Sequence, residues 1–344
     1  MKRTVILVAI AFLLAGALAF GEEATIIDFT KLSADIIPGA DGKMTQNRHT
    51  VMDYSVSAGA TFTNEQKALM KTSLGFENWE VVLNSSARNE TSTALSQVRA
   101  APVRSEAKVP FAGKDVLGVR VLFPASAVNA NARIKPPFEI PAFEPAADVS
   151  DSGEIKATGD ASKTATRFED GYGVVKNVGT IKSLSVTTQG QGFPHGLYVY
   201  LQDADGVERR YFMGYLNFDG WKELTWNNPA YIQEVRAREL RLMPVYPVAT
   251  PYVKFAGFLV TRDAADADVG SDYIGYFKDV KVIYDKAVLT TERDIADEDL
   301  WGIISDRERK KQTREMTNFG INQVNRFLEL EKQATENSFK SSLE

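Results

Sequence analysis

The spacing of the apolar residues constrains the fold of this chain more than any other feature. Between residue 26 and about residue 290, apolar and polar residues alternate in short runs that are bounded by Gly, Asn, Asp and Pro. A period of two is typical of strands with one buried face. In VLGVRVLF (116–123), every second residue from Leu117 to Phe123 is apolar, whereas Gly118 and Arg120 occupy the other face. The sequence therefore predicts an all-β fold, a jelly-roll-like antiparallel β-sandwich.

Nine runs are candidate strands. They are WEVVLN (79–84), VLGVRVLF (116–123), IKSLSVTT (181–188), GLYVYLQ (196–202), ERRYFMGYL (208–216), WKELTW (221–226), ELRLM (239–243), VKFAGFLVT (253–261) and FKDVKVIYD (277–285).

Two stretches lack the alternation and are expected to be long loops, residues 85–108 and residues 134–145. The second is rich in proline, which removes backbone donors and favours an extended path across a surface. We expect this segment to be a plain connection, and the alternative is a docking segment.

The N-terminus predicts the compartment. Lys2 and Arg3 precede an apolar run that ends in ALAFG, which is typical of a secretory signal peptide cleaved after Ala19 or Gly21. An uncleaved anchor is the alternative, although the run is short for a membrane span. The chain has no cysteine, which excludes disulfides and thiol chemistry. An exported chain without disulfides fits the periplasm or surface of a bacterium.

The C-terminus differs in kind from the body. From Ile295 onward the strands stop, charged residues increase and the apolar spacing becomes helical. We therefore expect a signal peptide at 1–21, a β-sandwich domain at 22–290 and a charged, mainly helical extension at 291–344. One helix face carries an apolar stripe that consists of Met316, Phe319, Val324, Phe327 and Leu328, with Ile321 nearby. Gly320 weakens this helix by roughly 1 kcal/mol relative to alanine. The stripe needs a partner, which is either the sandwich of the same chain or a neighbouring subunit.

Catalytic chemistry finds little support in the sequence. His49 and His195 are the only histidines, they lack metal-ligand spacing, and a structural role is expected for each. No nucleophile motif or phosphate loop occurs, so we predict no catalytic residue, no cofactor and no metal. Asp203 and Asp205 in LQDADGVE are expected in a hairpin turn. The acidic run 262–272 could hold Ca²⁺ but lacks the twelve-residue loop pattern.

Aromatic residues between 195 and 226 could instead form a binding surface. Tyr198 and Tyr200 share one strand face, opposite the apolar face of that strand. Trp221 and Trp226 differ by five positions, so they point to opposite faces and cannot form one flat platform. Trp226 is expected in the core, and Trp221 is the candidate exposed ring. A structural role for Trp221 at a sandwich corner is the alternative.

The same region carries a family resemblance. VGTIKSLSVTTQGQGFPHGLYVYLQDADGVERRYFMGYLNFDGWKELTWNNPAYI (178–232) resembles the central segment of the spirochaete flagellar filament outer-layer, or sheath, proteins. The similarity extends less densely to the signal peptide, IIDF (26–29), NWEVVLN (78–84) and FKDVKVIYD (277–285). The resemblance implies a periplasmic structural subunit that coats a flagellin core and affects the stiffness and shape of the filament. It carries over no catalytic residue.

Three hypotheses follow. The first is a sheath subunit, not an enzyme, whose partners are flagellin core subunits and other copies of itself or related sheath proteins. Its candidate interaction surface is Tyr198, Tyr200 and Trp221 together with Met316, Phe319, Val324, Phe327 and Leu328. The alternatives are a periplasmic carbohydrate-binding module and a glycoside hydrolase with paired carboxylates. The formal net charge of −5 argues against a nucleic-acid partner, and cleavage of the signal would leave no stable membrane anchor. If the tail mediates assembly, deletion of residues 313–344 should leave a folded protein that no longer sediments with flagella.

Overall fold

The computed structural model describes residues 21–39, 41–125, 127, 129–142, 147–149, 155–157, 167–239, 251–262, 272–287 and 295–341. Of the predicted signal peptide, residues 1–20 lie outside these ranges, and so does most of the acidic run 262–272.

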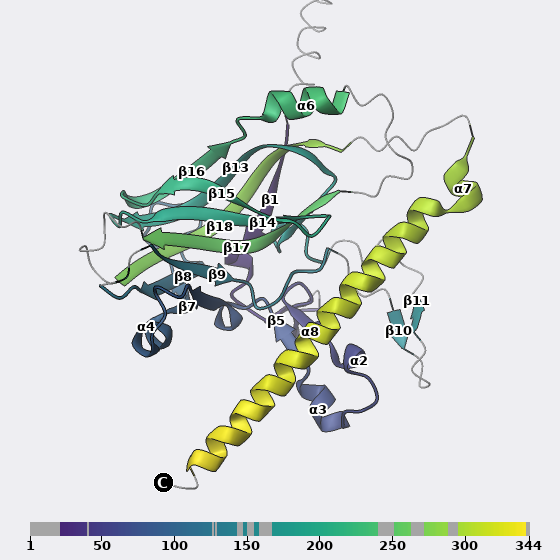
Figure 1. Cartoon of the computed structure of the whole chain (residues 1–344), viewed down its shortest axis with the longest axis horizontal. Coiled ribbons are helices and arrows are strands. Elements are labelled where there is room, and N and C mark those ends of the chain that lie inside the picture. Colours follow the sequence, from purple (N-terminus) through teal and green to yellow (C-terminus); the bar gives the residue numbers. More distant parts are fainter. Residues whose placement is uncertain are drawn as a thin grey trace, which may run out of the picture.

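The body of the protein is a sandwich of two antiparallel sheets (Figure 1). The first sheet has the order β16 (Asp219–Asn227), β13 (Val178–Gln191), β18 (Asp272–Lys286), β8 (Asp115–Leu122) and β7 (Gln97–Pro102), and β1 (Glu22–Asp28) also pairs with β18. The second sheet has the order β15 (Glu208–Tyr215), β14 (Gly196–Asp203), β17 (Tyr252–Arg262), β9 (Ala130–Lys135) and β6 (Glu80–Leu83), and β12 (Val174–Lys176) also pairs with β17. The predicted all-β sandwich with a helical tail is confirmed.

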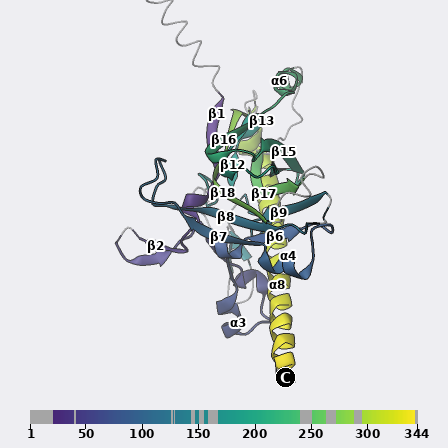
Figure 2. The ribbon, with the colours of Figure 1, turned by 90° about the vertical axis from the view of Figure 1, so that its left-hand side faces the viewer.

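Smaller elements surround the sandwich. The short strands form three two-stranded sheets: β2 (Ile36–Pro38) with β3 (Met44–Gln46), β4 (Val51–Asp53) with β5 (Lys71–Ser73), and β10 (Ala147–Val149) with β11 (Ile155–Ala157). The helices are α2 (Ser55–Ala58), α3 (Asn64–Leu69), α4 (Glu90–Leu95), α6 (Tyr231–Glu239), α7 (Asp297–Trp301) and α8 (Ile303–Ser341), with 3₁₀ turns η2 (Phe29–Lys31) and η3 (Phe76–Asn78). Figure 2 shows α8 running along the sandwich and continuing past it to the C-terminal end.

Eight of the nine predicted strands coincide with observed strands within a few residues. The ninth, 239–243, is not a strand at its first residue, because Glu239 ends α6, and residues 240–243 lie outside the described ranges. The predicted loop at 85–108 is wrong, since it contains α4 and β7. Asn89 caps α4 through its side chain, which accepts a hydrogen bond from the amide of Ser92 at 2.7 Å. In β7 only Val98 is buried, so this edge strand has no visible alternation.

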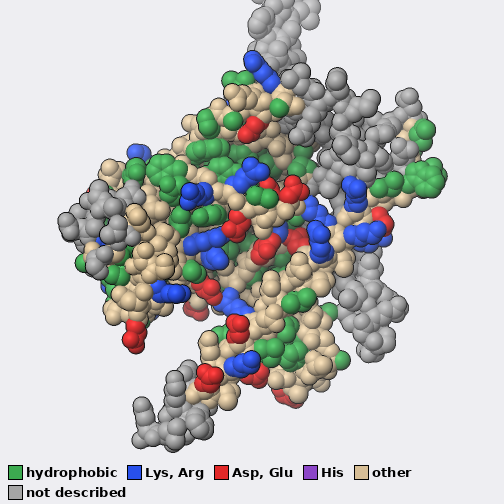
Figure 3. Space-filling model, viewed as in Figure 1, with side chains coloured by type: hydrophobic (Ala, Val, Ile, Leu, Met, Phe, Trp, Pro, Cys, Tyr) green, Lys and Arg blue, Asp and Glu red, His purple; other side chains and the backbone are tan. Residues whose placement is uncertain are grey.

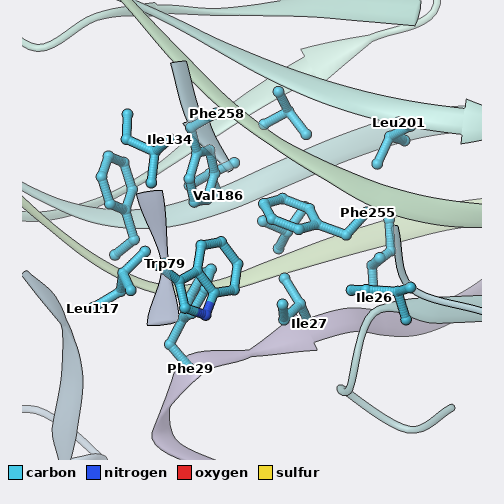
Figure 4. Close-up of a cluster of buried hydrophobic side chains, with 14 of the residues drawn as sticks. Ile26, Ile27, Phe29, Trp79, Leu117, Ile134, Val186, Leu201, Phe255 and Phe258 are labelled. Carbon is cyan, nitrogen blue, oxygen red and sulfur yellow. The ribbon is translucent and has the colours of Figure 1, made fainter. Parts of the chain in front are cut away.

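The core lies between the two sheets and is closed by the segment that follows β1. Phe29 and Trp79 pack edge to face, with ring centroids 5.4 Å apart, and both contact Phe255 of β17 (Figure 4). The indole N–H of Trp79 donates to the carbonyl of Leu74 at 2.8 Å, so the polar atom of this buried ring is paired. The alternating residues of VLGVRVLF from Leu117 to Phe123 are all buried, as their spacing predicts.

Candidate functional site

The apolar stripe of α8 packs against the body of its own chain. Phe319 is buried and meets the ring of Phe138 edge to face at a centroid distance of 5.3 Å. Met316, Val324 and Phe327 are half-buried against the same core. Residues of the same chain, among them Phe138 and Phe62, therefore cover this helix face. Within the stripe, Leu328 remains 37% exposed, and Ile321 beside it is 52% exposed.

The proline-rich segment docks this helix, which corrects its interpretation as a plain connection. The backbone amide of Ala142 donates to the Oε1 atom of Glu315 at 3.0 Å. The guanidinium of Arg326 donates to the carbonyl of Pro137 at 2.6 Å. Proline has no N–H to donate to a neighbouring strand, so this segment does not join a sheet, and the side chains of a helix can pair with its backbone groups. Residues 136–142 are therefore a helix-binding segment.

Gly320 allows α8 to approach α2 closely. A Cβ atom at this position would overlap the Cβ and Oγ atoms of Ser57, while the Cα of Ser57 would lie 3.6 Å away. The glycine that weakens the helix in isolation is thus required by the packing. It was singled out in the sequence only as a weak point.

A buried cation joins the helix to the second sheet. Lys254 of β17 is 3% exposed, and its ammonium contacts Glu139 at 3.2 Å and also Glu315 of α8. Removing Lys254 would leave the largely buried carboxylate of Glu315 without this cation. No pattern in the sequence separates Lys254 from an ordinary surface lysine, because the strand alternates around it.

The helix contacts the body near its C-terminal end as well. The side chain of Gln66 in α3 donates a hydrogen bond to Glu331 at 3.3 Å. Residues 332–336 are exposed, and α8 extends to Ser341. None of the helices in the described ranges is both long and apolar enough to cross a membrane.

The outer face of the second sheet carries the predicted tyrosines. Tyr198 and Tyr200 lie opposite the buried Leu197, Val199 and Leu201, as predicted, and both are half-buried. The guanidinium of Arg133 lies 4.3 Å from the ring centroid of Tyr200, and that of Arg210 lies 5.7 Å from the ring of Tyr198.

Two further aromatic residues extend this surface. Phe212 contacts Tyr198 at a centroid distance of 4.9 Å, and Tyr215 contacts Phe212 at 5.3 Å. Phe212 is 39% exposed and Tyr215 is 49% exposed, so they are the most open rings of the group. Sequence parity missed them, because a bulge inserts Met213 into β15 and brings residues three positions apart onto one face. We call Tyr198, Tyr200, Phe212 and Tyr215 the aromatic face.

The two tryptophans of β16 occupy opposite faces, as predicted. Trp226 packs on Tyr211 and the core, whereas Trp221 lies edge-on to the buried ring of Phe111 at 4.7 Å. Trp221 is half-buried, so it is not a freely exposed ring. The contact with Phe111 supports a structural role for Trp221, which was the alternative to an exposed binding ring.

The remaining candidates have structural contacts. His49 stacks on Tyr172 at 4.5 Å, and His195 is buried among Phe123, Phe193 and Tyr273. Asp203 forms the predicted turn, because its Oδ1 atom accepts from the amides of Asp205 and Val207. Across the described ranges, no group of three His, Cys, Asp or Glu side chains could hold a metal ion.

The family model and the relatives that match this chain carry the same description. The family described as flagellar filament outer layer protein Flaa matches residues 43–293. A flagellar filament outer layer protein of Treponema pallidum is 58% identical over 99% of this chain and 97% of its own length. One of Spirochaeta aurantia is 41% identical over 98% of this chain and 95% of its own length. Among solved structures, TmCBM61 in complex with beta-1,4-galactotriose is 11% identical, with a TM-score of 0.27, over 61% of this chain and 90% of that one.

Proposed function

This chain belongs to the flagellar filament outer layer protein family, and on that basis we propose that it is a structural subunit of the sheath of periplasmic flagellar filaments. In this role it coats a flagellin core and contributes to the stiffness and shape of the filament, and thereby to motility. The observation that carries the proposal is the similarity over nearly the whole chain to relatives with this one name. The signal peptide expected at residues 1–21 would deliver the protein to the periplasm.

A coat subunit needs repeated interfaces rather than a reactive pocket. Lateral contacts between neighbouring subunits resist sliding, and a filament surrounded by them bends less easily. The role does not require catalysis, and we propose that the protein is not an enzyme.

The aromatic face is our first candidate interface. Tyr198 and Tyr200 each carry a guanidinium over the ring, and the more open rings of Phe212 and Tyr215 are inclined at 76° to each other. A sugar stacks best on a flat, open ring, whereas mixed aromatic and arginine surfaces are enriched in protein interfaces. The geometry therefore favours a protein partner, either flagellin or another sheath subunit, over a carbohydrate. Trp221 lies on the other sheet and is a less suitable contact residue.

The C-terminal end of α8 is our second candidate interface. Met316, Phe319, Val324 and Phe327 are engaged within the chain, so Leu328 and the exposed residues after Glu331 are better placed to reach a neighbour. A helix that extends past its own body can lie in a groove of an adjacent subunit.

Composition of the isolated filament tests the proposal directly. Flagella are sheared from the source cells and purified, and this protein is quantified against flagellin. We expect a stoichiometric component that stays with the filament through washing. If it is absent from intact filaments, the proposed function is wrong.

The helix end needs a gentler test than deletion of residues 313–344. That deletion would remove Phe319 and expose Phe138, so loss of binding would report unfolding as well as lost assembly. Truncation after Glu331 retains the apolar stripe of α8 and the hydrogen bond between Gln66 and Glu331. We expect this variant to keep its unfolding temperature and to co-sediment less with flagella. Unchanged co-sedimentation would remove the helix end from the assembly mechanism.

A further inference from the structure

A groove separates α8 from the second sheet and is distinct from the aromatic face and from the C-terminal end of α8. It encloses about 790 Å³. One wall is α8, the other is the turn between β14 and β15, and the lining includes the buried Tyr252, Lys254 and Phe138. In Figure 3, basic and acidic side chains gather along the boundary between α8 and the sandwich.

The helix wall of the groove is basic. Arg307, Lys310, Lys311 and Arg314 line it at positions i, i+3, i+4 and i+7, which is the spacing of one helix face. At 1.5 Å per residue, this row is about 10 Å long. Like charges on one helix face repel each other, and an anion in the groove would relieve that repulsion.

The carboxylates in and beside the groove compensate only part of this row. Glu139 and Glu315 pair with Lys254, and Asp203 pairs with Arg209 at 3.5 Å. In the part of the chain that the structure describes, no ion pair involves Lys311 or Arg314. Lys310 pairs with the exposed Asp306 at 3.3 Å, so Lys311 and Arg314 are the members of the row that are available to an external anion.

Lys311 is a half-buried cation in the wall of the groove. Burial is the main cause that lowers the pKa of its ammonium; the nearby Asp205 and Glu315 raise the pKa, and Lys254 and Arg314 lower it. The ammonium also lies 4.7 Å from the ring centroid of Tyr252, which holds it in the groove. An anion beside Lys311 would favour its charged form.

We propose that this groove binds an acidic polypeptide segment of a partner protein, whose carboxylates pair with Lys311 and Arg314 and compete with Asp306 for Lys310. Four amide side chains in the lining can exchange hydrogen bonds with a peptide backbone: Gln202, Asn318, Asn322 and Gln323. An extended peptide advances about 3.3 Å per residue, so three residues span the basic row. The proposal goes beyond the sheath assignment, because it rests on the groove and holds for any partner with such a segment.

Peptide binding to the purified full chain tests the inference. The probe is fluorescein-labelled hexaglutamate, followed by fluorescence anisotropy, with labelled hexaglutamine as the neutral control. The test variant is Lys310→Gln/Arg314→Gln, in which both wild-type side chains are exposed. The control variant is Arg309→Gln/Lys332→Gln, which removes the same charge from exposed positions of α8 outside the groove.

We expect saturable hexaglutamate binding that weakens as salt is added, with no binding of hexaglutamine. The test variant should weaken binding by about tenfold or more, and the control variant should change it little. Circular dichroism and thermal unfolding verify that both variants fold. If the test variant is unstable, Arg314→Gln alone replaces it, and a smaller but selective loss is expected.

Three outcomes would overturn the inference. The first is an absence of hexaglutamate binding at low salt. The second is an equal loss in the test and control variants, which would indicate attraction to the helix as a whole. The third is displacement of the probe by tripolyphosphate more readily than by unlabelled hexaglutamate, which would indicate a general polyanion site.

Discussion

Replacing Gly320 with alanine should destabilise this protein although alanine is the better helix former. In an isolated helix the substitution would stabilise by about 0.8–1 kcal/mol. In the folded chain the added Cβ overlaps the Cβ and Oγ of Ser57, so α2 or α8 must shift. Overpacking of this kind costs about 1–3 kcal/mol, which exceeds the gain in propensity. We therefore expect Gly320→Ala to lower the free energy of unfolding by up to about 2 kcal/mol.

A double-mutant cycle with Ser57→Gly isolates the contact. In that background the nearest atom to the new Cβ among those described is the Cα of residue 57, 3.6 Å away, which is an ordinary contact distance. Gly320→Ala should then stabilise the protein, so its effect reverses sign, with a coupling energy of about 1–3 kcal/mol. Urea denaturation followed by tryptophan fluorescence measures all four variants. Stabilisation of equal size in both backgrounds would show that the close approach of α2 and α8 does not limit packing.

Three further predictions concern the core, the buried charge and alkaline pH. Trp79→Ala should lower the free energy of unfolding by about 3–5 kcal/mol in urea denaturation, whereas Trp221→Ala at its half-buried position should cost clearly less. Lys254→Met should destabilise by about 3–5 kcal/mol because Glu315 loses its cation, and Lys254→Met/Glu315→Leu should recover part of the loss; no recovery would argue against the ion pair. Burial raises the pKa of Tyr273 far above its ordinary value of 10.0, so between pH 10 and that higher pKa the unfolded state loses a proton that the folded state keeps. Stability should therefore fall as pH rises above 10, and Tyr273→Phe should make the fall shallower in denaturation series; an unchanged slope would contradict the assignment.

Local sequence pattern predicted the parts of the fold in which a single strand determines its own burial. Leu117 to Phe123 and the two faces of β14 follow directly from a period of two. The bulge at Met213 breaks that period, and its effect on Phe212 and Tyr215 depends on the register with β14, which lies outside the strand itself. The edge strand β7 was not predicted, because its single buried residue is too few to form an alternating pattern.

The helix contacts show the same division. The apolar stripe from Met316 to Phe327 was visible in the sequence, but its partner was not, because a stripe indicates that a face is buried without indicating by what. The sequence predicted a loop for the helix-binding segment, because this segment contacts α8 through backbone groups and a few apolar side chains such as Phe138, which form no periodic pattern. The burial of Lys254 could not be predicted either, because its ion pair depends on where Glu139 and Glu315 lie in the folded chain.

The pairing of β1 with β18 has a consequence for how this chain folds. Asp28 and Lys278 lie in contact although 250 positions separate them in sequence. β1 is synthesised first and β18 last among the strands of this sheet, so β1 can pair only after nearly the whole body has been synthesised. Contacts this distant in sequence form slowly, because the loop that they close is long. A chain with this topology stays open during synthesis and folds once its body is complete.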